Sequence, residues 1–304
     1  MLRNCPLISI IIPTYNQKPL YLNECIQSAI DQTYQNIEII ISDNFSTEAS
    51  VQEIISSFSF DKRVVTVKPV AHVSMADNFA FAASRAKGEY LSFLCSDDLL
   101  EKDAIEKLLC ILQQNTESHL AFGEIEYIRA ETKKHLRFHR KFQFKTGIYS
   151  ARDFIQFYIH LKNTVWMNGN LILKKLYNEV GGIITPGIYY SHDNTFLFRW
   201  LDNGYSIAYI NQLVGKVRVW RDEGKKADGN RDIKNVSDKI ETYQMVLNSN
   251  NLIALIGNRD TVIKIRNKKI IELAFFWLRR YLKGNTTQKE LKEVKKLMLK
   301  YYNS

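Results

Sequence analysis

The sequence predicts an α/β protein with a mostly parallel central sheet, flanking helices and a helical extension at the C-terminal end. Two observations support this fold class. Short apolar runs rich in β-branched residues alternate with helical patterns over residues 7–112, which is typical of βαβ units and parallel strands. Beyond residue 232 the apolar residues follow a helical period to the end of the sequence.

The first part of the sequence contains four expected strands. The run LISIII at 7–12 is continuously apolar, as expected of a strand that is buried on both faces. Apolar residues then recur at Leu22, Ile26 and Ile30, a stripe that predicts a helix over 20–30. By the same criteria we expect strands at 37–41, 64–67 and 90–94, and helices at 51–58, 75–86 and 104–112.

The second part is mixed and then helical. We expect strands at 120–128 and 171–173, and helices at 151–161 and 193–201. Residues 221–232 are polar and contain glycine, which predicts a loop or lid. The last helix begins at a T-x-x-E capping box, Thr287 to Glu290. The expected organisation is an α/β domain over 1–225 and a basic helical extension over 226–304.

Composition and cysteine spacing exclude several classes of protein. The chain is 45% hydrophobic and 24% charged, so it has material for a large core. The N-terminus lacks the cleavage pattern of a secretory signal. The longest apolar run, at 273–278, falls short of the roughly 20 residues of a membrane span. The four cysteines have no C-x-x-C spacing, which indicates neither a zinc site nor a disulfide framework, and we expect a cytoplasmic protein.

Positive charge is concentrated near the C-terminal end. The net charge is +10, and residues 237–304 carry 14 Lys and Arg against 6 Asp and Glu, a balance of +8. A basic tail on a near-neutral body predicts contact with an anionic surface. Apolar residues interleaved with cations over 263–280 fit a peripheral helix on the inner face of an anionic membrane, and equally a helix packed on the α/β domain. No nucleic-acid recognition motif is present, and no nucleic-acid partner is expected.

Polar and acidic residues follow three of the expected strands. Tyr15 follows the first strand, Asp43 the second, and Asp97 with Asp98 the fourth. Because ligands bind beyond the carboxyl ends of parallel strands, these side chains are expected to converge on one crevice. Glycine-rich phosphate-binding motifs are absent. A divalent cation held by carboxylates, Mn²⁺ or Mg²⁺, is therefore the expected means of binding a diphosphate.

Four segments, in this order, resemble the motifs of a known family. The segments ISIIIPTYNQ, IEIIISDNFST, AKGEYLSFLCSDDLL and HDNTFLFRWL are similar to those of the family 2 glycosyltransferases, and the resemblance covers residues 7–220. Each motif alone is unspecific, so their order and spacing carry the resemblance. It implies the GT-A fold and an inverting transfer of a sugar from a nucleotide donor, with a UDP-sugar expected, to an acceptor hydroxyl.

The resemblance also implies donor-site roles for single residues. Pro13 and Tyr15 match positions that line the nucleobase pocket. Asp43 matches an acid that accepts a hydrogen bond from the base. Asn78 matches a supporting position of the donor site, and Ser96 or water is expected to replace a missing oxygen ligand or ribose contact.

The reaction is assigned to three acids by the same resemblance. Asp97 matches the metal-binding acid of the D-x-D motif, and Asp98, the acid that follows it, is expected as a second metal ligand. The cation would neutralise charge on the leaving diphosphate. Asp193 matches the general base, which takes the proton of the acceptor hydroxyl in a single in-line displacement.

Three positions depart from the family pattern. Cys95 replaces the first Asp of D-x-D, and Trp220 replaces a His that helps to hold the metal or the diphosphate. His192 replaces the Glu of the acidic pair and is expected at the surface or in support of the site. These departures bear on metal affinity and motivate an alternative function, a nucleotide-sugar-binding protein with impaired catalysis. The acceptor implied by the resemblance is a glycan or lipid-linked glycan in bacterial surface polysaccharide (O-antigen or capsule) assembly.

Local structural roles compete with these assignments. Asp43 also fits a cap of the following turn. Asp97, Asp98 and Asp193 each fit the acidic first turn of a helix. Tyr15 also fits a packed aromatic residue. A functional site requires the strand-end acids to lie close together, which neither local role demands.

Overall fold

The computed structural model describes residues 5–138, 145–159, 168–184, 186, 188, 191–219, 229–282, 284 and 286–302. The chain divides into two compact units. The first unit comprises Met1–Ser150, Val165–Ile184 and Tyr205–Arg221. The second comprises Ala151–Thr164, Thr185–Gly204 and Asp222–Ser304. The domain boundary expected after residue 225 stays a prediction.

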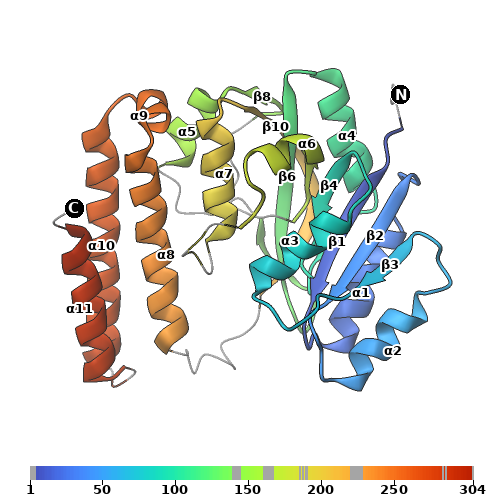
Figure 1. Cartoon of the computed structure of the whole chain (residues 1–304), viewed down its shortest axis with the longest axis horizontal. Helices are drawn as coiled ribbons and strands as arrows, with labels where there is room; N and C mark the ends of the chain where they lie inside the picture. Colours follow the sequence, from blue (N-terminus) through green and yellow to red (C-terminus); the bar gives the residue numbers. More distant parts are fainter. Residues whose placement is uncertain are drawn as a thin grey trace. The chain divides into compact units, whose positions relative to one another are not determined.

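A ten-stranded sheet forms the centre of the first unit. Eight strands follow the order β3-β2-β1-β4-β9-β6-β10-β5, while β7 pairs with β6 and β8 pairs with β10. The strands β1 to β4 are mutually parallel, and Figure 1 shows β1, β2 and β3 side by side. The antiparallel strand β9 separates them from the parallel pair β6 and β10. The mostly parallel sheet expected from the sequence is therefore confirmed. The strands are β1 (Ile8–Thr14), β2 (Ile37–Asp43), β3 (Val64–Val67), β4 (Tyr90–Phe93), β5 (Leu99–Leu100), β6 (Ser118–Arg129), β7 (His135–Phe138), β8 (Gly147–Tyr149), β9 (Asn170–Leu173) and β10 (Ser206–Val219).

Helices cover this sheet and complete its core. Every residue of β1 and β2 is buried, as their continuous apolar runs predict. The side chains of Ile10 and Ile39 belong to one apolar cluster with Leu22 and Ile26 of the first helix. The helices of this unit are α1 (Pro19–Ile30), α2 (Ala49–Ser57), α3 (Met75–Arg85), α4 (Ala104–Gln114) and α6 (Lys174–Glu179).

The register of the sheet sets the position of the strand ends. Thr14, the last residue of β1, pairs with Asp43, the last residue of β2. On the other side of β1, Ile11 pairs with Phe93, the last residue of β4. The segments that follow these three strands therefore leave the sheet at one edge, where ligands of parallel sheets bind.

The second unit is helical where it is described. Figure 1 shows its three long helices α8, α10 and α11 side by side, and Trp277 of α10 is buried in one apolar cluster with Val294 of α11. The helices are α5 (Ala151–Tyr158), α7 (His192–Asp202), α8 (Gly229–Asn248), α9 (Asn250–Ile256), α10 (Arg259–Leu282) and α11 (Gln288–Tyr302). Among the described residues, no helix has the length and apolar character needed to cross a membrane.

Details of this helical unit test three expectations. The capping box at α11 is confirmed, because the Glu290 amide donates to Thr287 Oγ1 at 3.2 Å and the Thr287 amide donates to Glu290 Oε2 at 2.7 Å. The helix expected over 151–161 already ends at Tyr158. The expectation of a loop over 221–232 is wrong at its C-terminal end, because α8 already begins at Gly229. Residues 221–228 lie outside the described part of the chain.

Candidate functional site

Seven of the expected site residues lie in the first unit, close to the carboxyl ends of β1, β2 and β4. Pro13 is in β1 and Tyr15 follows it, while Asp43 ends β2. The turn Cys95–Asp98 follows β4, and Asn78 lies in α3 beside β2. The structure thus brings together the strand-end residues Pro13, Tyr15, Asp43, Asn78, Ser96, Asp97 and Asp98.

Asp43 is almost fully buried, with 2% of its surface exposed. The Ser46 amide donates to its Oδ1 at 3.0 Å, and Gln52 Nε2 donates to its Oδ2 at 2.7 Å. Lys68 Nζ lies 3.8 Å from the same Oδ2. Asp43 therefore caps the turn that follows β2, as its local alternative role predicts. The same carboxylate ends a strand at the ligand-binding edge, so the two roles are compatible.

Asn78 is buried and bonds to the residue that precedes Asp43. Ser42 Oγ donates to Asn78 Oδ1 at 2.6 Å, and Asn78 Nδ2 donates to the Ser42 carbonyl at 3.1 Å. Both ends of the amide are used by one neighbour. Asn78 thereby fixes the end of β2 against α3, which matches a supporting position rather than a direct ligand contact.

An exposed aromatic pair stands at the same edge. The Tyr15 ring, 49% exposed, packs edge-on against His72, with ring centroids 4.8 Å apart. The loop that carries His72 is held by Asn44, whose side chain donates to the Val73 carbonyl at 2.8 Å and accepts from the Val73 amide at 2.9 Å. Sequence reasoning identified Tyr15 and missed His72 and Asn44, since neither follows a periodic pattern. A flat exposed ring at this position can stack on a planar base.

The turn after β4 is held by Asn168, which sequence reasoning also missed. Asn168 Oδ1 accepts from the Cys95 amide at 2.7 Å, and its Nδ2 donates to Asp98 Oδ2. The other Asp98 oxygen, Oδ1, accepts from the Arg218 amide at 2.8 Å. Burial raises the pKa of the Asp98 carboxyl well above its usual value, and the neighbouring charge of Asp97 adds to the increase. Asp98 is thus tied into the protein by both of its oxygens.

Asp97 and Ser96 are the remaining oxygen donors of this turn. Asp97 is half-buried, and Ser96 is buried with its Oγ accepting from Gln17 Nε2 at 3.3 Å. No group of three or more His, Cys, Asp or Glu side chains with metal-binding geometry occurs in the described ranges. One or two carboxylates nevertheless suffice for Mg²⁺ or Mn²⁺ when substrate phosphates supply further oxygens. The donor set at Asp97 therefore fits such a cation, with Asp98 committed to the protein.

Cys95 stands where the family pattern most often has an acid. Burial raises the pKa of its thiol well above the usual value, and the charges of Asp98 and Asp97 raise it further. The thiol is therefore protonated at neutral pH, which disfavours both metal binding and nucleophilic chemistry. This agrees with the sequence-based interpretation that the residue departs from the metal-binding pattern.

Asp193 lies in the second unit, in the first turn of α7. Its Oδ1 accepts from the Asn194 amide at 2.8 Å and from Asn194 Nδ2 at 3.3 Å. Tyr158 of α5 donates its hydroxyl to Asn194 Oδ1, which anchors this turn within the unit. His192 is buried, so a surface position, one of the two expected for it, is wrong. Trp220 lies outside the described residues.

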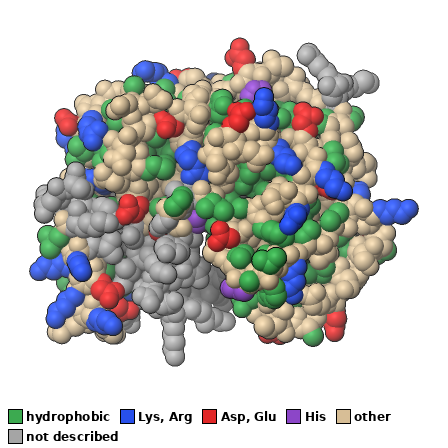
Figure 2. All heavy atoms as spheres, viewed as in Figure 1, with side chains coloured by type: hydrophobic (Ala, Val, Ile, Leu, Met, Phe, Trp, Pro, Cys, Tyr) green, Lys and Arg blue, Asp and Glu red, His purple; other side chains and the backbone are tan. Residues whose placement is uncertain are grey.

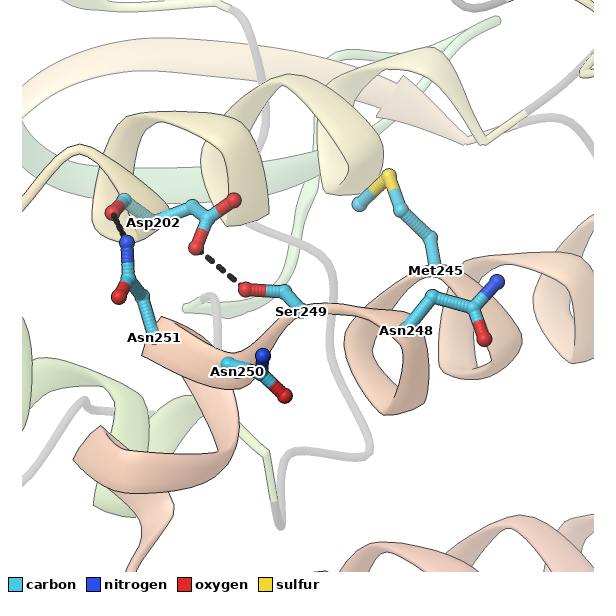
Figure 3. Close-up of a pocket in the computed structure, with 6 residues that line it drawn as sticks. All are labelled: Asp202, Met245, Asn248, Ser249, Asn250 and Asn251. Carbon is cyan, nitrogen blue, oxygen red and sulfur yellow. Dashed lines mark hydrogen bonds between the residues drawn. The ribbon is translucent and has the colours of Figure 1, made fainter.

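A separate pocket of about 440 Å³ lies in the second unit. Figure 3 shows that polar side chains from the end of α7 and from the junction of α8 and α9 line it. Ser249 Oγ donates to Asp202 Oδ1 at 2.5 Å, and Asn251 Nδ2 donates to the Asp202 carbonyl at 3.4 Å. Ser249 also caps α9, since its Oγ accepts from the Leu252 amide. These contacts join helix ends, and none of the sequence-predicted site residues lines the pocket.

Comparison with known proteins places these features in a family. The sequence pattern of the family described as Glycosyl transferase family 2 matches residues 9–168. An uncharacterized glycosyltransferase of Haemophilus influenzae is 39% identical over 127 residues, which are 40% of this chain and 50% of that protein. The match therefore spans half the length of this relative. The uncharacterized glycosyltransferase MJ1057 of Methanocaldococcus jannaschii is 27% identical over 219 residues, 70% of this chain and 71% of that protein.

A solved structure shares the fold. The crystal structure of S. aureus TarS 1-349 in complex with UDP-GlcNAc superimposes with a TM-score of 0.66 and 15% sequence identity. The superposition covers 97% of this chain and 91% of that one. At this identity the likeness concerns the fold alone, and it confirms the expected GT-A-type architecture.

Proposed function

The chain belongs to glycosyl transferase family 2, and we propose that it is an inverting glycosyltransferase that moves a sugar from a nucleotide donor, a UDP-sugar, to an acceptor hydroxyl. One observation carries the proposal. Tyr15, Asp43 and Asp97 leave three neighbouring strands at the ligand-binding edge of one parallel sheet. A nucleoside diphosphate can bind to such a set of side chains. The base requires an aromatic surface and a hydrogen-bond acceptor, and the diphosphate requires a cation site.

In this proposal the nucleobase lies at Tyr15 and Asp43. The Tyr15 ring offers a stacking surface, and the Asp43 carboxylate accepts a hydrogen bond from an N–H of the base. Gln52 now donates to Asp43 Oδ2, so it has to yield or share that oxygen when a base binds. Pro13 lies at the same end of β1, while Asn78 fixes the end of β2 through its hydrogen bonds with Ser42.

The diphosphate is proposed to bind through a divalent cation, Mn²⁺ or Mg²⁺, on Asp97. The half-buried Asp97 carboxylate and the neighbouring Ser96 hydroxyl supply hard oxygen ligands of the kind that these cations prefer. Such a cation supplies electrostatic stabilisation of the leaving diphosphate. Asp98, proposed as a second ligand from the sequence, supports this site by shaping the turn, since both its oxygens accept protein hydrogen bonds.

Asp193 is proposed as the general base that takes the proton of the acceptor hydroxyl. General-base catalysis contributes about 10²–10⁴ in rate. Asp193 lies in the first turn of α7, where the helix dipole is favourable to an acidic side chain. Replacement by Asn should abolish transfer and leave UDP binding intact, and near-normal turnover of that variant would remove the assignment.

The acceptor is proposed to be a glycan or lipid-linked glycan in bacterial surface polysaccharide assembly, reached at an anionic membrane surface. Support comes from α10, where Ile271, Phe275, Leu278 and Leu282 recur at helical spacing and are all exposed. Figure 2 shows several basic side chains, with acidic ones among them, over the part of the face where Figure 1 places α11. Co-sedimentation with phosphatidylglycerol vesicles at low salt tests this proposal, and the absence of binding would exclude it.

A nucleotide-sugar-binding protein with impaired catalysis is the second candidate function. It is favoured by Cys95, which stands where the family pattern has an acid. Because its thiol pKa is raised, the thiol is a poor metal ligand in the turn that carries Asp97 and Asp98. A panel of nucleotide sugars with Mn²⁺ separates the two, because a bound donor raises the melting temperature by mass action whereas turnover requires catalysis. Stabilisation by a UDP-sugar with release of UDP supports the enzyme. Stabilisation with no release, over any acceptor tested, supports the binding protein.

A further inference from the structure

Arg218, near the end of β10, places a guanidinium group in the protein interior. Its side chain is 0% exposed. The guanidinium lies over the ring of Tyr21 in α1, with 4.8 Å between Cζ and the ring centroid. A buried cation is costly unless it is paired and hydrogen-bonded, so its partners reveal what the position requires.

Arg218 contacts the turn after β4 through its backbone amide and its guanidinium, and it contacts one acid of α1 through the guanidinium. Its backbone amide donates to Asp98 Oδ1 at 2.8 Å, and its Nη1 donates to the Asp97 backbone carbonyl. Its Nη2 donates to Glu24 Oε2, with which it forms an ion pair. One residue therefore holds both Asp97 and Asp98 and is itself held by Glu24.

Glu24 is anchored from a second side. Its side chain is 20% exposed, and its Oε1 pairs with Lys133 Nζ at 2.6 Å. Lys133 lies in the turn between β6 and β7 with a φ of +53°, a left-handed backbone that fixes the direction of that turn. Because two cations from separate elements share its carboxylate, Glu24 has a defined orientation when it receives Arg218.

We propose that Arg218 and Glu24 act as a positioning pair that holds the turn of Asp97 and Asp98 in the geometry required to bind a cation and a nucleoside diphosphate. The inference rests on the proposed function. A guanidinium suits the task because its rigid fork donates in two fixed directions, here to a carbonyl and to a carboxylate, whereas an ammonium is a compact charge on a flexible stem. The pair acts through Asp97 and touches neither the donor nor the cation.

UDP binding by the full-length protein over a range of MnCl₂ concentrations tests the proposal. We expect Arg218→Lys to raise the Mn²⁺ concentration for half-maximal UDP binding about tenfold or more, the usual effect of losing a partner that orients a metal ligand. Glu24→Gln keeps an acceptor and loses the charge, so a smaller rise in the same direction is expected. Lys175→Gln, at an exposed helix position, is the matched control.

Uridine binding without metal distinguishes positioning from general damage. The pair predicts unchanged uridine affinity in both variants, since uridine lacks the diphosphate. Equal weakening of uridine and UDP, or an unchanged Mn²⁺ requirement in both variants, would overturn the inference. If Arg218→Lys does not fold, Glu24→Gln decides alone, because its site is partly exposed. Failure of the wild-type protein to bind UDP with Mn²⁺ would instead contradict the proposed function, in which a UDP-sugar is the donor.

Discussion

Asn168 donates a hydrogen bond to the carboxylate of Asp98, although 70 residues separate the two in sequence. The same side chain accepts from the Cys95 amide, so one buried amide closes the turn that carries the acids of the D-x-D position. The geometry of the proposed cation site therefore depends on a residue outside every recognised motif.

Replacement of Asn168 by Ala should destabilise the protein. It removes a donor to Asp98 and leaves the Cys95 amide without its partner, which costs about 1–3 kcal/mol. Urea denaturation of the purified variant measures the loss. Asn36→Ala, at an exposed position whose side chain donates to the Cys5 carbonyl, serves as the control and should change the free energy of unfolding little. Equal stability of Asn168→Ala and wild type would show that this amide does not hold the turn.

The stability of the protein should depend on the titration of Asp98. Its pKa is raised in the folded state, so between the unfolded and folded pKa values the native protein binds more protons than the unfolded chain. The contribution of this group is fully present below the unfolded pKa of 3.8 and is lost as pH rises through the folded pKa. Relative to wild type, Asp98→Asn should therefore gain stability as pH increases above 4. Urea unfolding of both proteins from pH 4 to 8 would reveal the opposite trend if the pKa were lowered.

Tyr15 should contribute to donor binding through its exposed ring. Stacking of an aromatic ring on a base contributes about 1–3 kcal/mol, so Tyr15→Ala should weaken UDP binding roughly tenfold or more, whereas Tyr15→Phe should bind nearly as well. Isothermal titration calorimetry provides the measurement. Phe60→Ala removes another exposed ring and should leave UDP affinity unchanged. Loss of affinity in the Phe60 variant, or none in Tyr15→Ala, would contradict the stacking role.

The cysteines should differ in their reactivity toward iodoacetamide. Cys5 is exposed, whereas burial raises the thiol pKa of Cys25 and of Cys95 well above the usual value. Among these three cysteines, we expect mass spectrometry at pH 7.5 to detect alkylation of Cys5 first and of Cys25 and Cys95 only after unfolding. Rapid labelling of Cys95 in the folded protein would mean that its thiolate is stabilised, contrary to the environment described above.

The sequence was sufficient for the elements whose signal is local. β1 and β2 are continuous apolar runs, and the structure places both strands within two residues of the expected bounds. Their polar ends, Tyr15 and Asp43, follow from the rule that ligands bind at the carboxyl ends of parallel strands. The capping box of Thr287 and Glu290 was also predictable from the sequence, because its two residues are only three positions apart.

Contacts between distant segments were not predictable from the sequence. Arg218 and Glu24 are 194 residues apart, and no local pattern indicates that they pair. Asn168 precedes a four-residue strand and has no helical or alternating pattern around it. His72 lies in a loop, where periodicity gives no information about neighbours. The contacts of such residues can be recognised only from the folded structure, in which the strand order brings distant segments together.

The Asp97 carboxylate, in the turn after β4, is proposed to bind a cation together with the diphosphate of a UDP donor. Calorimetric titration of UDP into wild type and Asp97→Asn, each with and without Mn²⁺, tests it most directly. We predict that Mn²⁺ strengthens UDP binding to the wild type by tenfold or more, as roughly expected for a metal-bridged diphosphate, and has almost no effect on the variant. Equal Mn²⁺ enhancement in the two proteins would contradict the account.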